Sequence, residues 1–268
     1  MFLKLFSIEW TRLARRSVLW VTFICCSLFI WLSLQNFYNR NRTQLLDGTL
    51  KMPGASFDLA NALDQLLIIS LPFLVILAAL MLGNDYAQRT NQHWLARVSR
   101  PSSLLAKFSL LALVTFLLQL LILLVGGATG WYYKTFTYEA YTLSNVNLLA
   151  ALLAAFYMTL VTLPYLSLIL LITVATRSAF AGIAIGLGYT QFIELLLSSV
   201  LYGADWAKWM MRNLYFSATY LLNSIGNRTV ETPSHLLDPG AAFVMAAAYT
   251  LTFLFLAVRL YRRQDLGG

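Results

Sequence analysis

Charged residues are scarce in this chain of 268 residues. Lysine, arginine, aspartate and glutamate together make up 11% of the sequence, whereas 59% is hydrophobic. A soluble domain usually carries about 25% charged residues, so this composition excludes an ordinary soluble enzyme. Intrinsic disorder is excluded as well, because such an apolar chain with so little charge does not stay unfolded in water. The remaining class is an integral membrane protein.

Residues that form disulfides or bind metals are also rare. Two adjacent cysteines, Cys25 and Cys26, lie in one apolar run, and the two histidines are far apart. We therefore expect no disulfide framework and no metal site. The sequence lacks the P-loop pattern GxxxxGK(S/T), and it also lacks HExxH, GxSxG and GxGxxG. We therefore predict neither catalytic nor cofactor-binding residues in this chain.

The hydrophobic residues form long continuous runs. A helix needs about 20 apolar residues to cross the hydrocarbon core of a bilayer. Six runs satisfy this length, and Glu194 is the one charged residue that we place inside a span. The run that contains Pro164 has room for two short helices, but we favour one long helix. We predict an all-α integral membrane protein with a single transmembrane domain over residues 1–268 and spans at about residues 18–34, 66–82, 108–125, 148–174, 179–201 and 241–258.

The distribution of basic residues predicts the orientation. With the N-terminus inside, the inner segments carry 12 Lys and Arg residues and the outer loops carry 7. Cytoplasmic loops normally carry this excess, so we expect both termini in the cytoplasm of a bacterial cell and a multi-pass protein in its plasma membrane. The basic surplus then serves topology and contact with the lipid bilayer, and we expect no nucleic acid partner.

The N-terminal residues 1–16 are predicted to form a helix that lies on the membrane surface. At helical spacing, Leu3 and Trp10 fall on one side and Lys4, Arg12 and Arg15 fall on the other. Basic residues opposite apolar and aromatic residues are typical of an interfacial helix. The alternative is a basic flank that only orients the first span.

Residues 84–106 form the longest predicted cytoplasmic segment. Trp94 and Leu95 lie there beside Arg97 and Arg100. A short amphipathic helix with an apolar ridge and a basic rim suits docking into a groove of another protein. The alternative is a solvated loop that holds positive charge for topology, although topology alone does not require Trp94.

Residues 202–240 are unusually aromatic for an outer loop, with Trp206, Trp209 and Tyr215 close together. Aromatic residues concentrate at membrane interfaces. We expect a re-entrant or interfacial segment between spans five and six. A simple aromatic belt is the alternative.

Span five carries a polar stripe. A charged residue inside a membrane span is by default a functional hypothesis. At helical spacing, Glu194 shares one face with three polar residues, so this face should contact protein or water. The stripe either lines a translocation path or subunit interface, or it holds a protonated Glu194 hydrogen-bonded to a neighbouring helix. The members of the stripe are Gln191, Glu194, Ser198 and Tyr202.

Two pairs of glycines are spaced four residues apart in the predicted spans. Gly182 and Gly186 lie in span five, and Gly126 and Gly130 lie at the outer end of span three. Such spacing lets two membrane helices approach closely. We expect close helix packing at both pairs.

Together, these features resemble the permeases of the type-2 ATP-binding-cassette (ABC) exporter family. The family often has an acidic residue, three further positions, Gly-Thr, then Ser-Arg and a lysine entering span three. This chain has Asp85, Arg89-Thr90, Ser99-Arg100 and Lys107, with Arg89 in place of the glycine. The family often ends on an aromatic residue, basic residues and Asp-Leu, as in residues 261–266 here.

The resemblance implies half of a dimeric transmembrane path for export. A separate P-loop ATPase, in two copies, would bind ATP and Mg. It would dock on the Asp85–Arg100 loop and against the N-terminal helix, and the loop helix would pass its motion to the spans. The second permease chain would be identical or homologous. The resemblance also assigns the ATPase-coupling residues: Asp85, Arg89, Thr90, Trp94, Leu95, Arg97 and Arg100.

Two other function classes remain open from the residues alone. An ion-coupled transporter or channel would use Glu194 as its relay and would need no ATPase. A membrane-embedded enzyme or assembly scaffold would need several polar residues at one depth, and only the Glu194 stripe qualifies.

Overall fold

A computed structural model describes residues 2–47, 49, 55–87, 100–137, 147–201, 204, 206–222, 233 and 235–264, and all regular elements among these residues are helical. Two of the elements, η1 and η2, are π-helical and η3 is a 3-10 turn. The elements are α1 (Phe2–Ala14), α2 (Ser17–Arg40), α3 (Arg42–Leu46), α4 (Ala55–Asp64), α5 (Leu66–Ala87), α7 (Arg100–Tyr132), η1 (Tyr133–Thr137), α8 (Leu148–Thr176), α9 (Ala179–Leu187), η2 (Gly188–Ile193), α10 (Glu194–Val200), η3 (Ala207–Trp209), α11 (Met211–Thr219) and α12 (Pro239–Arg263).

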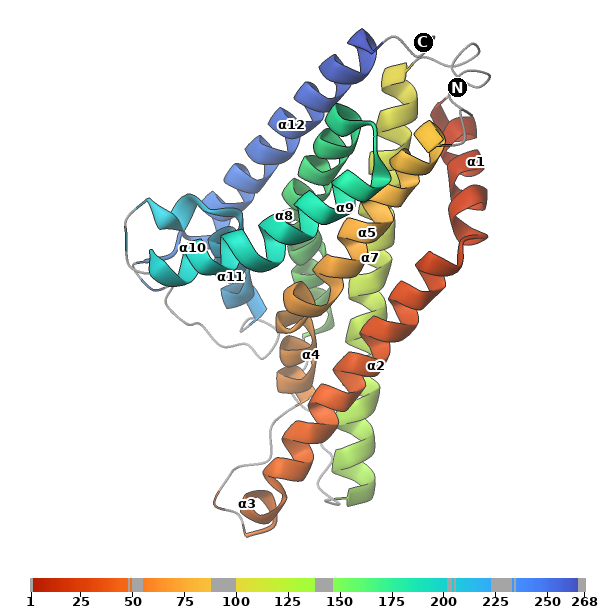
Figure 1. The fold of residues 1–268 in the computed structure, drawn as a ribbon. Coiled ribbons are helices and arrows are strands. Elements are labelled where there is room, and N and C mark those ends of the chain that lie inside the picture. Colours follow the sequence, from red (N-terminus) through yellow and green to blue (C-terminus); the bar gives the residue numbers. More distant parts are fainter. Residues whose placement is uncertain are drawn as a thin grey trace.

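Six helical runs are long and apolar enough to cross a membrane, which confirms the predicted number of spans. They are α2, α5, α7 with η1, α8, the continuous run of α9, η2 and α10, and α12 (Figure 1). The fourth span is one helix that continues through Pro164, as predicted. Membrane helices tolerate an internal proline because neighbouring groups satisfy the freed carbonyl.

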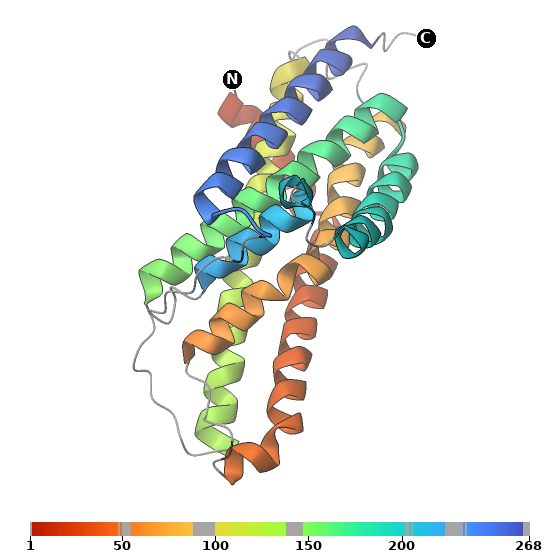
Figure 2. The ribbon, with the colours of Figure 1, turned by 90° about the vertical axis from the view of Figure 1, so that its left-hand side faces the viewer.

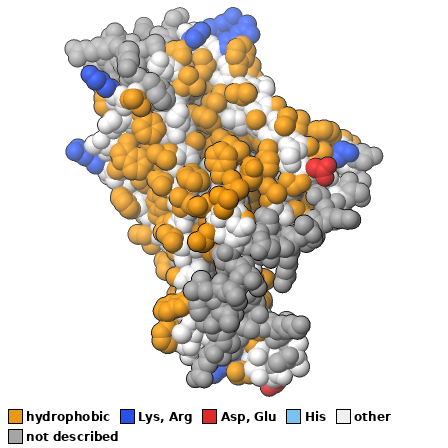
Figure 3. All heavy atoms as spheres, turned by 180° about the vertical axis from the view of Figure 1, so that it is seen from behind, with side chains coloured by type: hydrophobic (Ala, Val, Ile, Leu, Met, Phe, Trp, Pro, Cys, Tyr) orange, Lys and Arg blue, Asp and Glu red, His pale blue; other side chains and the backbone are white. Residues whose placement is uncertain are grey.

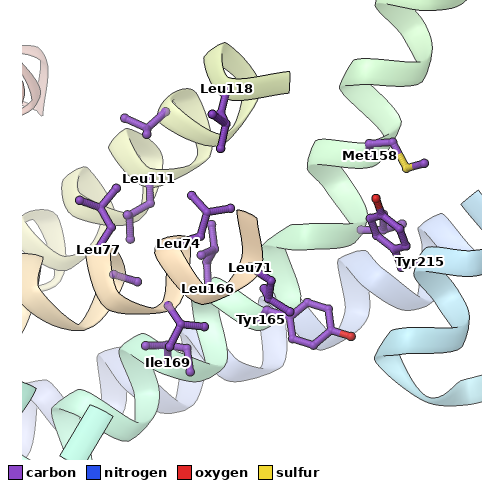
Figure 4. Close-up of a cluster of buried hydrophobic side chains, with 14 of the residues drawn as sticks. Leu71, Leu74, Leu77, Leu111, Leu118, Met158, Tyr165, Leu166, Ile169 and Tyr215 are labelled. Atoms are coloured by element: carbon purple, nitrogen blue, oxygen red, sulfur yellow. The ribbon is translucent and has the colours of Figure 1, made fainter. Parts of the chain in front are cut away.

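The central helix is α8. It packs against α5, α7, α9, α11 and α12, so most of the fold surrounds it. Apolar side chains from α5, α7 and α8 meet in the centre of the bundle (Figure 4). The labelled leucines of this cluster are Leu71, Leu74, Leu77, Leu111, Leu118 and Leu166.

The exterior is apolar around its middle, with basic side chains concentrated toward one end (Figure 3). Large hydrophobic side chains point outward from spans one, five and six, including Trp20, Phe192 and Phe255. A soluble protein does not expose apolar surface on this scale. This surface therefore contacts lipid.

Both termini lie at the same end of the molecule, here named the N/C end (Figures 1 and 2). The opposite, distal end is formed by α3 with the adjoining ends of α2 and α7. Span three runs from Pro101 to Thr137, or 37 residues, about 55 Å of helix at 1.5 Å per residue. The hydrocarbon core is only about 30 Å thick, so the predicted span of 108–125 is the middle of a longer helix.

The short helix α4 was not predicted, because its 10 residues are too few and too polar to read as a span. It packs along the distal half of α7. A Cβ added at Gly126 would overlap Ala62, and one added at Gly130 would overlap Asp58. The predicted glycine pair therefore allows close helix packing, with α4 as its partner.

The second glycine pair joins α9 to two other spans. A Cβ at Gly182 would overlap the Thr173 side chain of α8, and one at Gly186 would overlap Ile169 of α8 and meet Val75 of α5 at 2.8 Å. Gly83 of α5 contacts the backbone of Ala179, where α9 begins. Close packing at this predicted pair is also confirmed.

The N-terminal helix α1 packs against α7 as well as displaying an apolar surface. Leu5, Glu9 and Leu13 are buried, whereas Leu3 and Trp10 are exposed. Arg12, predicted to lie on the side opposite Leu3 and Trp10, is partly exposed, and its guanidinium pairs with Glu9 and Asp85. Arg12 turns toward the bundle because two buried carboxylates lie there.

The other two special segments are described in part. Helix α5 continues to Ala87 and α7 begins at Arg100, so both ends of the predicted 84–106 segment belong to span helices. Within the predicted re-entrant segment, α11 packs against α8, α10 and α12. Residues 88–99, 202–203, 205, 223–232 and 234 lie outside the described part of the chain.

Candidate functional site

Four charged side chains meet at the N/C end, and we name them the N/C ion cluster: Glu9 and Arg12 of α1, Asp85 of α5 and Lys107 of α7. The Lys107 Nζ atom lies 2.7 Å from Glu9 Oε1 and 2.8 Å from Asp85 Oδ2. An Arg12 guanidinium nitrogen lies 3.2 Å from Asp85 Oδ1 and another lies 3.4 Å from Glu9 Oε1. The cluster joins the ends of three helices, two of which border residues 88–99.

Three of the four side chains in the cluster are buried, whereas the Arg12 side chain is 32% exposed. Lys107 is 1% exposed, Asp85 is 4% exposed and Glu9 is 5% exposed. Two acids and two bases balance the formal charge. Removing one partner of a buried ion pair leaves an uncompensated charge and typically costs about 3–5 kcal/mol. The three helix ends are therefore held together by groups that are costly to separate.

A second contact nearby joins the end of α5 to the ends of α8 and α12. The amide nitrogen of Gln264, just after α12, donates to the Val174 carbonyl of α8 at 2.5 Å. The hydroxyl of Tyr86 in α5 donates to the other amide atom, Oε1, at 2.9 Å. Gln264 belongs to the C-terminal motif of the sequence, and buried Tyr261 of that motif packs edge-on against Tyr86.

The carboxylate of Glu194 is buried where α10 begins. Its Oε1 atom accepts a hydrogen bond of 2.7 Å from the backbone N–H of Arg212, in the first turn of α11. The first N–H groups of a helix lack internal partners, and a negative charge there is favourable. Its Oε2 atom and the Tyr165 hydroxyl, which lies near this carboxylate, are both buried. Glu194 thus anchors α11 to span five.

The rest of the polar stripe differs from this carboxylate. Gln191 lies in the π-helical turn η2, and Ser198 bonds to the Leu195 carbonyl of its own helix. Both are partly exposed, whereas Glu194 is 1% exposed. Tyr202 lies outside the described residues. A π-turn before a buried carboxylate is a frequent feature of functional sites.

A second buried ion pair lies toward the distal end. Asp58 of α4 pairs with Lys134 of η1 and accepts a hydrogen bond of 2.7 Å from the Tyr38 hydroxyl. The Tyr38 ring stacks on Tyr133. Burial raises the pKa of Asp58 above its ordinary value of 3.8, and the Lys134 charge and the Tyr38 hydrogen bond oppose this rise. This pair fastens α4 to α2 and α7.

The predicted coupling residues are placed unevenly. Asp85 is in the N/C ion cluster, and Arg100 is the first residue of α7. The remaining five lie outside the described residues: Arg89, Thr90, Trp94, Leu95 and Arg97. Among the described residues, no group of three or more His, Cys, Asp or Glu side chains is arranged to hold a metal ion.

Comparison with known proteins decides the family. A family model described as ABC-2 family transporter protein matches residues 5–192, well over half of the chain. The chain belongs to the ABC-2 family. No curated protein matches the chain. Members of the ABC-2 family are membrane subunits without a catalytic ATPase domain, so membership implies an ATP-binding-cassette ATPase as partner.

The matched ABC-2 region contains the N/C ion cluster and the Asp58–Lys134 ion pair. Glu194 and Arg212 lie beyond it. The family match and the six candidate spans agree that this is a multi-pass membrane protein. It also agrees with the family resemblance predicted from the sequence.

Sequence reasoning gave no role to Glu9, Asp58 or Lys134. One signal was available for Glu9, because it shares a helical face with Leu5 and Leu13 and thus interrupts an apolar stripe. No comparable signal exists for Asp58 and Lys134. They are 76 positions apart, and only the packing of α4 on α7 brings them together.

Proposed function

We propose that this ABC-2 chain is one half of a dimeric transmembrane path that exports a substrate from the cytoplasm or the inner leaflet. Hydrolysis of ATP on a separate P-loop ATPase, present in two copies, drives the export. The second permease chain is identical or homologous. The family match over residues 5–192 is the observation that carries this proposal.

In this proposal the ATPase docks on residues 84–106 and against α1, with the N/C end in the cytoplasm of a bacterial cell. The basic side chains at that end favour this orientation. ATP and Mg bind to the ATPase. Trp94, Leu95, Arg97 and Arg100 supply the apolar and basic contact, with Arg89 and Thr90 beside them.

The N/C ion cluster transmits the movement in this proposal. Asp85 lies at the start of the docking segment and Lys107 directly follows its end, and each pairs with a residue of α1. A displacement of the docking residues therefore pulls α1, α5 and α7 together. The buried charges resist separation, so the three helix ends move as a unit and carry the motion to the spans.

The translocation path in this proposal lies along α5 and the span formed by α9, η2 and α10. Close packing at Gly83 and Gly186 supports coupled movement of these two spans. The polar stripe faces the path or the second permease chain through Gln191, Ser198 and Tyr202. Glu194 holds α11 against α10, the last helix of the same span.

Purification of the full chain with its ATPase tests the proposal. We expect a complex of two permease and two ATPase chains, and ATP-dependent flux in liposomes that contain both proteins. Liposomes with the permease alone should show no flux. Flux from the permease alone would instead indicate an ion-coupled transporter or channel, and absence of any ATPase complex would refute the proposal.

A further inference from the structure

A cavity of about 420 Å³ lies between α10, α11 and the residues that precede α12. Serine side chains of α10 form one wall, and polar side chains of α11 form another. Leu195, Phe216 and Leu236 contribute apolar surface. None of the described residues that line the cavity is acidic.

The cation of this cavity is Arg212. Its guanidinium carbon lies 5.3 Å from the centre of the Phe216 ring, a cation–π arrangement that fixes the side chain. Among the described residues, no acceptor lies within hydrogen-bonding distance of its guanidinium, and the buried Glu194 carboxylate is the acid near enough to feel its charge. The Glu194 contact uses the backbone N–H of Arg212 and leaves all guanidinium donors available.

The surroundings of the cavity are apolar and face outward. Leu196 and Val200 of α10 are 62% and 77% exposed, and Phe192 of η2 is 68% exposed. These residues belong to a membrane span, so lipid chains cover them. The candidate span ends at Val200, beside the cavity, and the end of a membrane-crossing helix is expected at the headgroup region.

We propose that this cavity binds the headgroup of an anionic phospholipid, with Arg212 as the ligand of the phosphate. The planar guanidinium can bind two phosphate oxygens at once. Asn213 also lines the cavity, and its amide nitrogen, which donates one hydrogen to the Ala207 carbonyl, has a second hydrogen for another phosphate oxygen. The hydroxyls of Ser198 and Ser199 donate to carbonyls of their own helix. The lipid tails extend along the exposed residues of α10. This role goes beyond substrate transport.

The lack of an acidic residue among the described lining residues favours one lipid class. Zwitterionic headgroups carry an ammonium group next to the phosphate, and this group would need a carboxylate or a free aromatic face, whereas the Phe216 ring already faces the Arg212 guanidinium. The one described cation of the lining, Arg212, instead favours a net negative headgroup. A lipid bound there bridges α10 and α11, which Glu194 already joins.

Native mass spectrometry of the full chain in detergent tests the proposal, with dioleoyl phosphatidylglycerol as the anionic probe and dioleoyl phosphatidylcholine as the zwitterionic one. We expect phosphatidylglycerol to bind about tenfold more tightly than phosphatidylcholine, since a charged hydrogen bond is worth about 1.5–3 kcal/mol. Arg212→Gln should remove this preference. Lys208→Gln, a matched loss of charge four positions away and outside the cavity lining, should keep it.

A second variant tests the cavity without removing its charge. Ser199→Trp places an indole at the rim of the cavity and should also abolish the preference. Equal binding of both lipids by the wild type, or an unchanged preference in Arg212→Gln and Ser199→Trp, would overturn the proposal. Binding of inorganic phosphate as tight as that of phosphatidylglycerol would also overturn it, because the site would then serve a free anion.

Discussion

The ammonium group of Lys107 lies 2.7 Å from the carboxylate of Glu9, 98 positions earlier in the chain. Both side chains are buried. This contact ties the N-terminal helix α1 to the start of α7, immediately after the residues proposed to receive the ATPase. A local change in that contact should therefore affect both stability and coupling.

Replacing Lys107 with methionine should destabilise the protein by about 3–5 kcal/mol, because Glu9 and Asp85 would lose their shared buried cation. Thermal unfolding in detergent measures the effect. Arg259→Met removes an exposed charge from the same end and should leave the unfolding temperature unchanged. Equal stability of wild type and Lys107→Met would contradict the role of the N/C ion cluster.

The close packing of α4 on α7 predicts a difference between neighbouring glycines. Gly130→Ala should lower stability by about 1–3 kcal/mol, because the new methyl group would overlap Asp58 and force the helices apart. Gly127→Ala is the matched control, since its methyl group would meet only Leu59 Cδ2 at 3.4 Å. Similar unfolding temperatures for the two variants would show that α4 does not pack in this way.

Two substitutions of Glu194 separate its hydrogen bond from its charge. Glutamine keeps an oxygen that accepts the Arg212 N–H, whereas alanine leaves this buried donor unpaired at a cost of about 1–3 kcal/mol. We expect Glu194→Ala to impair transport while the ATPase complex still assembles, and Glu194→Gln to retain most of the transport. Full transport by Glu194→Ala would show that the anchoring of α11 is dispensable.

The buried Asp58 predicts a pH dependence of stability. Because burial raises its pKa above 3.8, the folded protein holds the proton more tightly than the unfolded chain. The stabilisation is then complete below pH 3.8 and is lost as pH rises through the folded pKa. The unfolding temperature of wild type should therefore fall with rising pH relative to Asp58→Asn. A wild-type unfolding temperature that rises with pH relative to that of Asp58→Asn would contradict this, because it would mean that the Lys134 charge dominates and lowers the pKa of Asp58.

Much of the architecture was predictable because lipid imposes a simple rule on sequence. A span must be a long apolar helix, and six such runs are visible in the chain and in the structure. The continuation of α8 through Pro164 followed from the same rule. The full length of α7 did not, because a helix that leaves the hydrocarbon no longer needs apolar residues.

The partners in the N/C ion cluster and the partner of Glu194 could not be predicted from the sequence, for a different reason. The Arg12–Asp85 pair joins residues 73 positions apart, and no local pattern specifies such a partner. Helical spacing grouped Arg12 with Lys4 and Arg15 on the basic side of the N-terminal helix, because it counts polarity and does not reveal a buried carboxylate on another helix. Glu194 was recognised as unusual, yet its partner is a backbone N–H of α11, which a side-chain pattern does not reveal.

The most direct test of the proposed coupling is the rate of ATP hydrolysis by the partner ATPase reconstituted with this chain in liposomes. We predict that wild-type chain stimulates hydrolysis, and that simultaneous alanine substitution of Trp94, Arg97 and Arg100 removes the stimulation while the chain stays in the membrane. The matched triple variant at the distal end replaces Arg40, Arg42 and Trp131 and should hydrolyse ATP like wild type. Unchanged hydrolysis with the Trp94, Arg97 and Arg100 variant would contradict the account.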